Sequence, residues 1–515
     1  MSELRIRTGQ VAPLLILLAG AAALRLLLLD TRELFRDEAA SWLLARSAWG
    51  EIISRSVNEP YAPLYPFVLK AWIGVLGDGQ ASLRALSALA GVAVVGVTWA
   101  WTRQAIGSTA AVLAAALVAL SPLAIANARE ARMYALESLF AVLAWWLIWR
   151  LLTRRAPGAG SPLAVVAASV AVAGELWMLP TGVSVFALQA TVVAILAVRR
   201  AAGTRAAGIA LAIGLVAFLP WIPRLLSVAG GGQPFWTPTP DLAALLETVA
   251  GGFGGWRPSP GWAALLPLAV LAVLGFRALF RRGVADPTAL TLSAGAALTL
   301  AWWVASLWRP AYDSRYLGAA VPPLAMAIAA GAKSLAARLQ RSRWTPRMLG
   351  AAAAVVLILV GAGTAAFEAE WVSGEGQSPA HAAAILLERR VQPGDIVLVV
   401  DARTYFPLAY LLERDSKPIK LPAPLRYWRS GREPAYTGGD LIPADATIPR
   451  DASLQPGELL GLAPSGSIWL VALADPAGEI RGFAPLANGQ VAEKELLEVS
   501  DHGDSGLILR LRPAP

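Results

Sequence analysis

Apolar residues occur along this chain in separate blocks of about 18 to 22, the length that an α-helix needs to cross the hydrocarbon core of a membrane. The blocks predict eleven membrane-spanning helices, near residues 11–29, 84–102, 109–127, 134–151, 162–180, 182–198, 207–223, 261–279, 288–307, 317–334 and 348–367. No small-residue cleavage site follows the first block, so we expect a retained span and not a signal peptide. The pattern predicts a polytopic α-helical membrane protein.

Charged residues between the blocks predict which side of the membrane each loop faces. Arginine clusters, such as Arg154 with Arg155 and Arg281 with Arg282, follow every second predicted span, and such clusters are typical of cytoplasmic loops. Acidic residues before position 368 lie almost entirely at the opposite ends of the spans. We therefore expect a cytoplasmic N-terminus, with the carboxylates collected on the extracytoplasmic face of a cell membrane of the bacterial inner-membrane type.

Three segments outside the spans have distinctive patterns. Residues 39–57 form an amphipathic stretch that contains tryptophan, and residues 63–77 are apolar but too short to span, so we expect the latter to lie on the outer membrane surface as an interfacial helix. Residues 233–260, rich in Gly, Pro and Trp, predict a second outer loop long enough to act as a lid.

The C-terminal region has the pattern of a soluble α/β domain. Helical spacing is expected over 379–390 and 405–413, and strands over 395–400, 468–473 and 507–511. The sequence therefore predicts two domains: a transmembrane catalytic domain over 1–367 and an extracytoplasmic α/β domain over 368–515.

The composition excludes several kinds of active site and one class of partner. Hydrophobic residues make up 56% of the chain and charged residues only 15%, whereas a soluble chain carries about a quarter charged. The absence of cysteine excludes disulfides and a thiol nucleophile, and because His381 and His502 both lie after the last span, a histidine-based site among the spans is excluded. The net charge of +9 comes from the membrane part, and no recognised nucleic-acid module accompanies it, so nucleic acid is not expected as a partner.

The sharpest candidate site is the acidic pair Asp37 and Glu38, directly after the first span. Two carboxylates at a membrane surface lie where a lipid headgroup and an outside substrate would meet. The alternative is structural: Asp37 caps the N-terminus of a helix and Glu38 favours the helix dipole.

Three further motifs fall on the same predicted face. The first has prolines and tyrosines around Glu59, Tyr61 and Tyr65, and the alternative for it is an interfacial turn. The other two contain arginines, which suit phosphate because the guanidinium presents several donors and keeps its charge. Their candidate residues are Arg129, Glu130, Arg132, Tyr134, Tyr312, Arg315 and Tyr316. For the arginines, an internal ion pair and snorkelling at a helix end remain the alternatives.

These motifs resemble those of the GT-C superfamily of integral-membrane glycosyltransferases, in the branch with protein O-mannosyltransferases and the lipid A aminoarabinose transferase. The resemblance covers residues 1 to about 370 and rests on Asp37-Glu38-Ala39, Ala62-Pro63-Leu64-Tyr65, Arg129 to Leu136, Arg315-Tyr316-Leu317 and Pro322-Pro323-Leu324. Many relatives have His or Lys before the Pro-Pro pair, where this chain has Tyr61 with Ala62, and relatives have Gln in place of Arg129.

The resemblance implies an inverting transfer of a sugar from a polyprenyl-phosphate donor to a lipid, glycan or protein acceptor. Asp37 would be the general base; Glu38 and Glu59 would orient hydroxyls or hold a divalent cation such as Mg or Mn. Arg132 and Arg315, with Tyr312 and Tyr316, would hold the phosphate.

Two other function classes remain open. A transporter or flippase of lipid-linked sugars would need charges near the middle of the membrane, where Arg25, Glu137 and Glu175 are the candidates. A non-catalytic binding protein that presents its C-terminal region outside would leave the acidic and arginine motifs unexplained.

Overall fold

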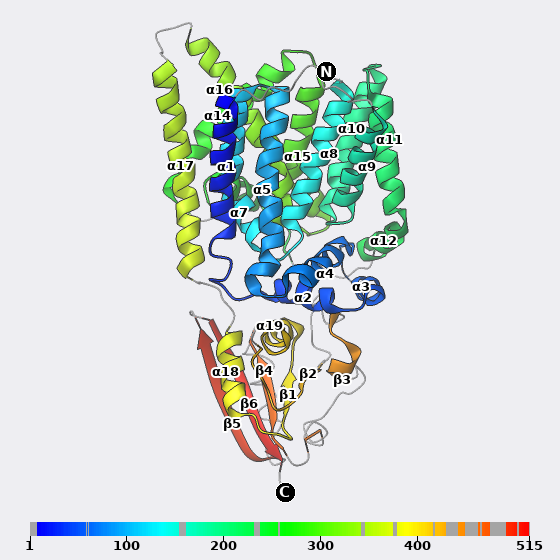
Figure 1. Ribbon diagram of the computed structural model, residues 1–515, viewed down its shortest axis with the longest axis vertical. Helices are drawn as coiled ribbons and strands as arrows, with labels where there is room; N and C mark the ends of the chain where they lie inside the picture. Colours follow the sequence, from blue (N-terminus) through cyan, green and yellow to red (C-terminus); the bar gives the residue numbers. More distant parts are fainter. Residues whose placement is uncertain are drawn as a thin grey trace. The chain divides into compact units, whose positions relative to one another are not determined.

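The computed structural model describes most of the chain (Figure 1). The described residues are 8–57, 59, 61–153, 161–230, 237–255, 258–340, 346–373, 379–415, 418–428, 441–448, 462–463, 466–473, 491–501 and 504–513. Contacts divide the chain into two units. The first unit comprises Met1–Leu27, Pro60–Tyr65 and Arg84–Ala369, and the second unit comprises Leu28–Glu59, Pro66–Leu83 and Glu370–Pro515. The domain boundary expected between residues 367 and 368 stays a prediction.

The first unit is built from helices. They are α1 (Thr8–Leu26), most of α5 (Gln80–Ala105), α6 (Ser108–Ala119), α7 (Pro122–Arg129), α8 (Tyr134–Thr153), α9 (Pro162–Leu176), α10 (Thr181–Val198), α11 (Thr204–Phe218), η1 (Leu219–Trp221), α12 (Ile222–Gly230), α13 (Leu242–Phe253), η2 (Pro260–Ala264), α14 (Leu265–Phe280), α15 (Pro287–Trp308), η3 (Ser314–Ala320), α16 (Val321–Leu339) and most of α17 (Pro346–Ser373). Figure 1 shows many of them side by side, and their apolar faces form one core.

The count of spans is lower than predicted. Within the described residues, eight helices are long and apolar enough to cross a membrane, and α6 with α7, bent by 56° at their junction, makes a ninth if the pair is one span. All eleven predicted segments contain helix, but two are only short apolar helices, Ala12–Leu26 and Pro162–Leu176. The polytopic helical class is confirmed; eight or nine spans, not eleven, are supported by length and composition.

Local sequence explains the break between α6 and α7 and the close packing of α14 on α16. Pro122 cannot continue the preceding helix, and the Ser121 hydroxyl accepts a hydrogen bond from the Ala124 N–H at 3.2 Å, which starts α7. In α14 and α16, Gly275 and Gly331 let the backbones approach, since a Cβ on Gly275 would lie 1.9 Å from a carbonyl oxygen of α16.

The second unit joins three N-terminal helices to the C-terminal region. The helices are α2 (Arg36–Arg46), α3 (Trp49–Ser56) and α4 (Leu64–Leu76), the last from Pro66 onward. The predicted amphipathic stretch 39–57 is thus two helices, and the predicted interfacial segment 63–77 is helical.

In the first unit, the predicted loop 233–260 is not only loop, since it contains α13. Its residues 233–236 and 256–257 lie outside the described residues.

The C-terminal region contains a six-stranded sheet in the order β3-β2-β1-β4-β6-β5, with helices α18 (Ala380–Arg390) and α19 (Ala402–Glu413). The strands are β1 (Ile396–Val399), β2 (Leu425–Trp428), β3 (Thr447–Ile448), β4 (Ile468–Ala472), β5 (Val491–Asp501) and β6 (Asp504–Pro513), and a short η5 (Ala444–Ala446) precedes β3. The first four strands are parallel, whereas β6 pairs antiparallel with β4 and β5. The three predicted strands and two predicted helices are confirmed.

Candidate functional site

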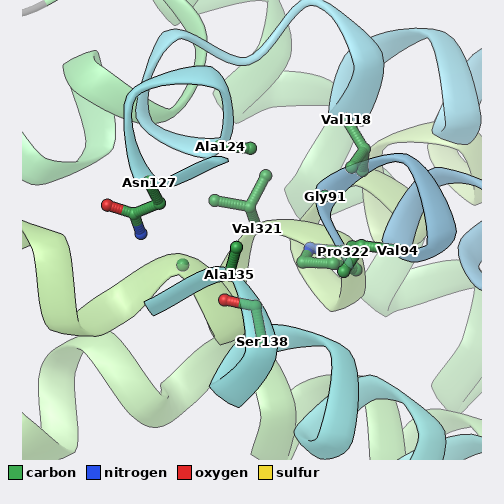
Figure 2. A pocket seen from close by; sticks show the side chains of 10 residues that line it. Gly91, Val94, Val118, Ala124, Asn127, Ala135, Ser138, Val321 and Pro322 are labelled. Carbon is green, nitrogen blue, oxygen red and sulfur yellow. The ribbon is translucent and has the colours of Figure 1, made fainter. Parts of the chain in front are cut away.

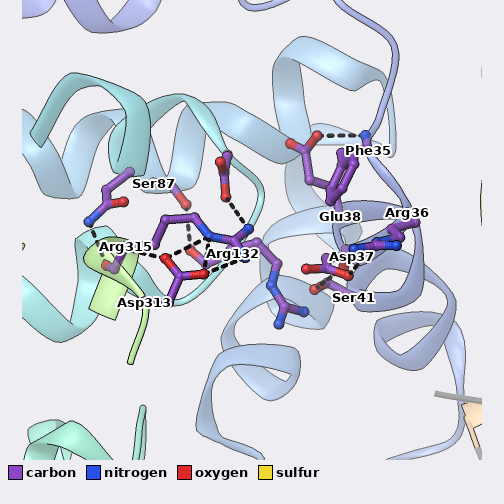
Figure 3. A network of polar contacts seen from close by, with 11 residues as sticks. Phe35, Arg36, Asp37, Glu38, Ser41, Ser87, Arg132, Asp313 and Arg315 are labelled. Atoms are coloured by element: carbon purple, nitrogen blue, oxygen red, sulfur yellow. Dashed lines mark hydrogen bonds and ion pairs between the residues drawn. The ribbon is translucent and has the colours of Figure 1, made fainter. Parts of the chain in front are cut away.

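The acidic pair lies in the first turn of α2, in the second unit. The residue before the helix, Phe35, has no side-chain oxygen to cap it, and Glu38 reaches back instead: its Oε2 accepts a hydrogen bond from the Phe35 N–H at 2.9 Å (Figure 3). Glu38 is only 2% exposed. The structural alternative had named Asp37 as the capping residue, and that assignment is wrong.

Asp37 has a different environment from its neighbour. Its side chain is 33% exposed, and its Oδ1 lies 3.7 Å from the Arg36 Nε (Figure 3). The Ser41 hydroxyl donates to the Asp37 backbone carbonyl at 3.0 Å. Asp37 is therefore the more exposed carboxylate of the pair, while Glu38 holds the start of the helix.

The segment around Glu59 is described only in part. The Glu59 N–H donates to the Ser56 carbonyl at 3.0 Å, which continues the turn after α3. Tyr65 lies in the first turn of α4 and is 1% exposed, so its ring is part of the packed interior. Asn58 and Pro60 lie outside the described residues.

A cluster of two arginines and three tyrosines, which we call the cationic cluster, forms in the first unit from residues far apart in sequence. Arg132, 8% exposed, places its guanidinium carbon 5.3 Å from the Tyr61 ring centroid and 5.9 Å from that of Tyr134. The guanidinium carbon of Arg315 lies 5.6 Å from the same Tyr134 ring, and the Tyr134 and Tyr316 centroids are 5.8 Å apart. Five predicted site residues are thus brought together, with both cations on aromatic faces.

Carboxylates hold Arg315 in place. Its NH2 lies 3.0 Å from the Asp313 Oδ2, and its NH1 lies 4.0 Å from the Glu130 Oε2 (Figure 3). Asp313 also accepts from the Arg315 N–H at 2.9 Å and caps η3, and the Asn127 amide donates to the Arg315 carbonyl at 2.9 Å. Asp313 and Asn127 were not among the predicted site residues. For Asp313 the sequence held a signal, because this acid lies two residues before Arg315.

Tyr312 and Arg129 are committed to other partners. The Tyr312 hydroxyl donates to the Thr248 hydroxyl of α13 at 2.8 Å, and burial raises the pKa of Tyr312 to about 12, so the phenol is neutral at pH 7. Arg129, 1% exposed, pairs with both Glu368 oxygens at 2.9 Å and donates to the Leu24 carbonyl at 2.6 Å. This is the internal ion pair that the sequence left as the alternative for Arg129, although its partner is distant.

A small pocket lies in the first unit, and one of its lining residues, Asn127, donates to the Arg315 carbonyl. Asn127 and Ser138 are its polar lining residues, and the remaining lining residues are Gly91, Val94, Val118, Ala124, Ala135, Gly318, Val321 and Pro322 (Figure 2). A Cβ on Gly318 would lie 2.6 Å from the Ser138 hydroxyl oxygen, so this side of the pocket needs glycine.

Among the described residues, no three Asp, Glu, His or Cys side chains lie together in a way that could hold a metal ion. The divalent cation named from the resemblance stays a prediction.

Comparison with known proteins identifies the class of fold. A family model described as dolichyl-phosphate-mannose-protein mannosyltransferase matches residues 58–223. A search of curated proteins by sequence finds no match.

Solved structures match over nearly the whole chain. The structure is similar to ArnT from Cupriavidus metallidurans in the apo state, with a TM-score of 0.66 and 16% identity over 98% of both chains. It is also similar to the same protein bound to undecaprenyl phosphate, with a TM-score of 0.64, 16% identity and the same coverage.

A third match is the archaeal oligosaccharyltransferase AglB from Archaeoglobus fulgidus, in complex with an inhibitory peptide and a dolichol-phosphate. Its TM-score is 0.54 at 12% identity, over 82% of this chain and 65% of that one. The family-model match over residues 58–223 and the fold shared with these structures agree with the predicted resemblance to the GT-C superfamily.

Proposed function

We propose that this protein is an inverting glycosyltransferase that moves a sugar from a polyprenyl-phosphate donor to a hydroxyl acceptor on the extracytoplasmic face of a cell membrane. The observation that carries the proposal is that the structure provides both an accessible carboxylate, at Asp37, and two guanidiniums held on tyrosine rings, at Arg132 and Arg315. The undecaprenyl and dolichol phosphates bound by the similar structures support a lipid phosphate as the leaving group.

The reaction needs one base and one phosphate site. The acceptor oxygen attacks the anomeric carbon while the bond from that carbon to the phosphate oxygen breaks, and the phosphate leaves with the electron pair. Asp37 takes the hydroxyl proton as the acceptor oxygen forms its new bond. No general acid is required, because a phosphate leaves without a proton, in contrast to the leaving group of a glycosidase.

The cationic cluster suits the leaving phosphate. Two guanidiniums held on tyrosine rings supply donors that are oriented before the charge develops, and preorganised donors of this kind stabilise a transition state without reorganising. Glu130 and Asp313 fix Arg315, so its guanidinium is oriented before the phosphate charge develops. Tyr316 packs against Tyr134 and completes the support.

The extracytoplasmic assignment rests on the arginine clusters of the loops, which are typical of the opposite, cytoplasmic side. A transporter is less well supported, because the buried acids inside the helix bundle have local polar partners: the Glu175 Oε2 accepts from the Gln189 amide at 3.1 Å, and the Glu137 Oε1 accepts from the Thr181 hydroxyl at 3.5 Å.

The test is the Asp37→Asn variant, which keeps the side-chain shape and removes the base. Transfer should fall by about 10²–10⁴-fold while binding of the donor lipid is retained. The matched control is Glu51→Gln, which changes an exposed acid on α3 that pairs with Arg55. Near-normal transfer by Asp37→Asn would remove Asp37 from this role.

A further inference from the structure

Asp78 is a buried carboxylate in the second unit, in the turn after α4, that contacts both α2 and the segment that ends α19. It is 2% exposed, and its Oδ2 accepts a hydrogen bond from the Trp42 indole N–H at 3.2 Å. The same oxygen accepts from the Asp415 N–H at 2.9 Å. One carboxylate oxygen therefore joins the helix that carries Asp37 to the chain that follows α19.

Packing around this oxygen is dense and specific. The Tyr410 hydroxyl of α19 donates to the Asp78 carbonyl at 3.2 Å, and the Tyr410 ring meets the Trp42 ring edge to face, with centroids 5.2 Å apart. Trp42 and Tyr410 are 0% and 1% exposed. Aromatic pairs of this geometry stabilise their packing beyond the area that they bury.

Basic side chains hold the C-terminal end of α2 in the same place. Arg46 lies 3.9 Å from the Asp78 Oδ2 and 3.6 Å from the Asp415 Oδ1, and it donates to the Glu413 carbonyl. Lys70 of α4 donates to the Ser47 carbonyl at 2.8 Å. A cation at the end of a helix also complements its dipole. The last turn of α2 is thus fixed by groups from α4, from Asp78 and from the end of α19.

We propose that Asp78 is a positioning residue through which the C-terminal region sets the place of α2, and with it the place of Asp37. Trp42 lies one helical turn after Glu38, so a shift of the indole moves the first turn of α2 as well. The inference rests on the proposed function, and it gives the C-terminal region a role in the reaction itself. Misplacement of a reacting group by about 1 Å can cost about 100-fold in rate.

The experiment uses the full-length protein in lipid and compares Asp78→Asn with a matched variant, Asp395→Asn. Asp395 is also buried, and it also accepts from a tryptophan indole, that of Trp469 at 2.9 Å, and from a backbone N–H, that of Ser467. These partners lie in β4 or directly before it. Two quantities are measured: kcat and KM for the donor, and hydrogen exchange of the α2 amides 39–47.

Asp78→Asn keeps an accepting oxygen but removes the negative charge that faces Arg46 and strengthens the two hydrogen bonds. It should lower kcat by about 10- to 100-fold with KM for the donor nearly unchanged, and should speed exchange in α2. Asp395→Asn should lower the unfolding temperature without either effect per folded molecule. If Asp78→Asn does not fold, Trp42→Phe serves as the second variant, because it removes the indole donor and keeps a packed ring; it should give the same changes at smaller size.

Failure of the inference and failure of the proposed function give different results. If the wild type transfers no sugar but Asp78→Asn alone speeds α2 exchange, the proposed function fails and the positioning contact stands. If the wild type transfers sugar and Asp78→Asn keeps its kcat, or loses it only as much as Asp395→Asn does, the positioning role is wrong. Unchanged α2 exchange in both Asp78→Asn and Trp42→Phe would also overturn it.

Discussion

The start of α2 and the junction of α7 with α8 each place like charges close together in sequence. In both, one member makes a structural hydrogen bond or ion pair, and we propose the other for the reaction. At α2, Glu38 caps the helix and Asp37 stays accessible. At the α7–α8 junction, Arg129 is locked in a bidentate ion pair, whereas Arg132 lies on tyrosine rings.

The two regions differ in where the structural partner comes from. Glu38 bonds to the backbone three residues away, but Glu368 lies 239 residues from Arg129. The first division of roles follows from local helix geometry, and the second requires the fold. Substitutions of Arg129, Arg132, Tyr134 and Glu38 test which side chains are structural and which take part in the reaction. They follow from the largest expected effect to the smallest.

Arg129→Ala should destabilise the protein by about 3–5 kcal/mol, because it leaves the Glu368 carboxylate without its main partner. Thermal unfolding in a fixed detergent would measure this, and the double variant Arg129→Met with Glu368→Met should recover part of the loss. If Arg129→Ala unfolds at the wild-type temperature but binds the donor more weakly, Arg129 has the role assigned here to Arg132.

Arg132→Ala should weaken binding of a polyprenyl phosphate by about 10- to 100-fold, the size expected for hydrogen bonds to a charged group. Arg132→Lys should be intermediate, since the ammonium keeps the charge and loses the planar fork. Titration with the lipid phosphate alone would show this. As a control, Arg103→Ala removes an arginine whose guanidinium lies 5.1 Å from the Trp99 ring and should bind as the wild type does.

Tyr134→Leu should weaken the same binding by about 1–2 kcal/mol, because both arginines of the cationic cluster rest on this ring. Tyr134→Phe keeps the aromatic face and should stay close to the wild type. Equal losses in the two variants would assign the effect to the hydroxyl, and the cation–π account would be wrong.

Glu38→Ala should cost about 1 kcal/mol of stability through the lost cap, and Glu38→Gln should cost less because an amide oxygen still accepts from the Phe35 N–H. Transfer per folded molecule should remain close to wild type in Glu38→Gln. A loss there as large as that of Asp37→Asn would make Glu38 a second acid of the reaction and contradict its assignment to the cap.

Local signals predicted much of this protein. The apolar blocks located the helices, and the apolar run at Ile396–Val399 located a central strand. Strand β5, with the sequence VAEKELLEVSD, was missed because charged residues obscure its alternation; charges are common on edge strands, where they discourage pairing with other chains. Within the described residues, all eleven predicted segments contain helix, and eight or nine helices are long and apolar enough to cross a membrane.

Contacts between distant segments could not be predicted from the sequence. The motifs named Arg132, Arg315 and Tyr134 as candidates, but their meeting around one ring depends on how η3 packs against α8. Asp78 carried no signal at all, since one acid in a glycine-containing turn is ordinary, and its role appears only when Trp42 and Asp415 are seen to share its oxygen.

The most direct test of the proposed function is transfer from a panel of labelled polyprenyl-phosphate sugars by the purified wild-type protein with a membrane extract as acceptor source. The account predicts that label from one donor passes to an acceptor with inverted anomeric configuration and that the lipid phosphate is released. No transfer from any donor by folded protein that binds the lipid phosphate tightly would contradict it.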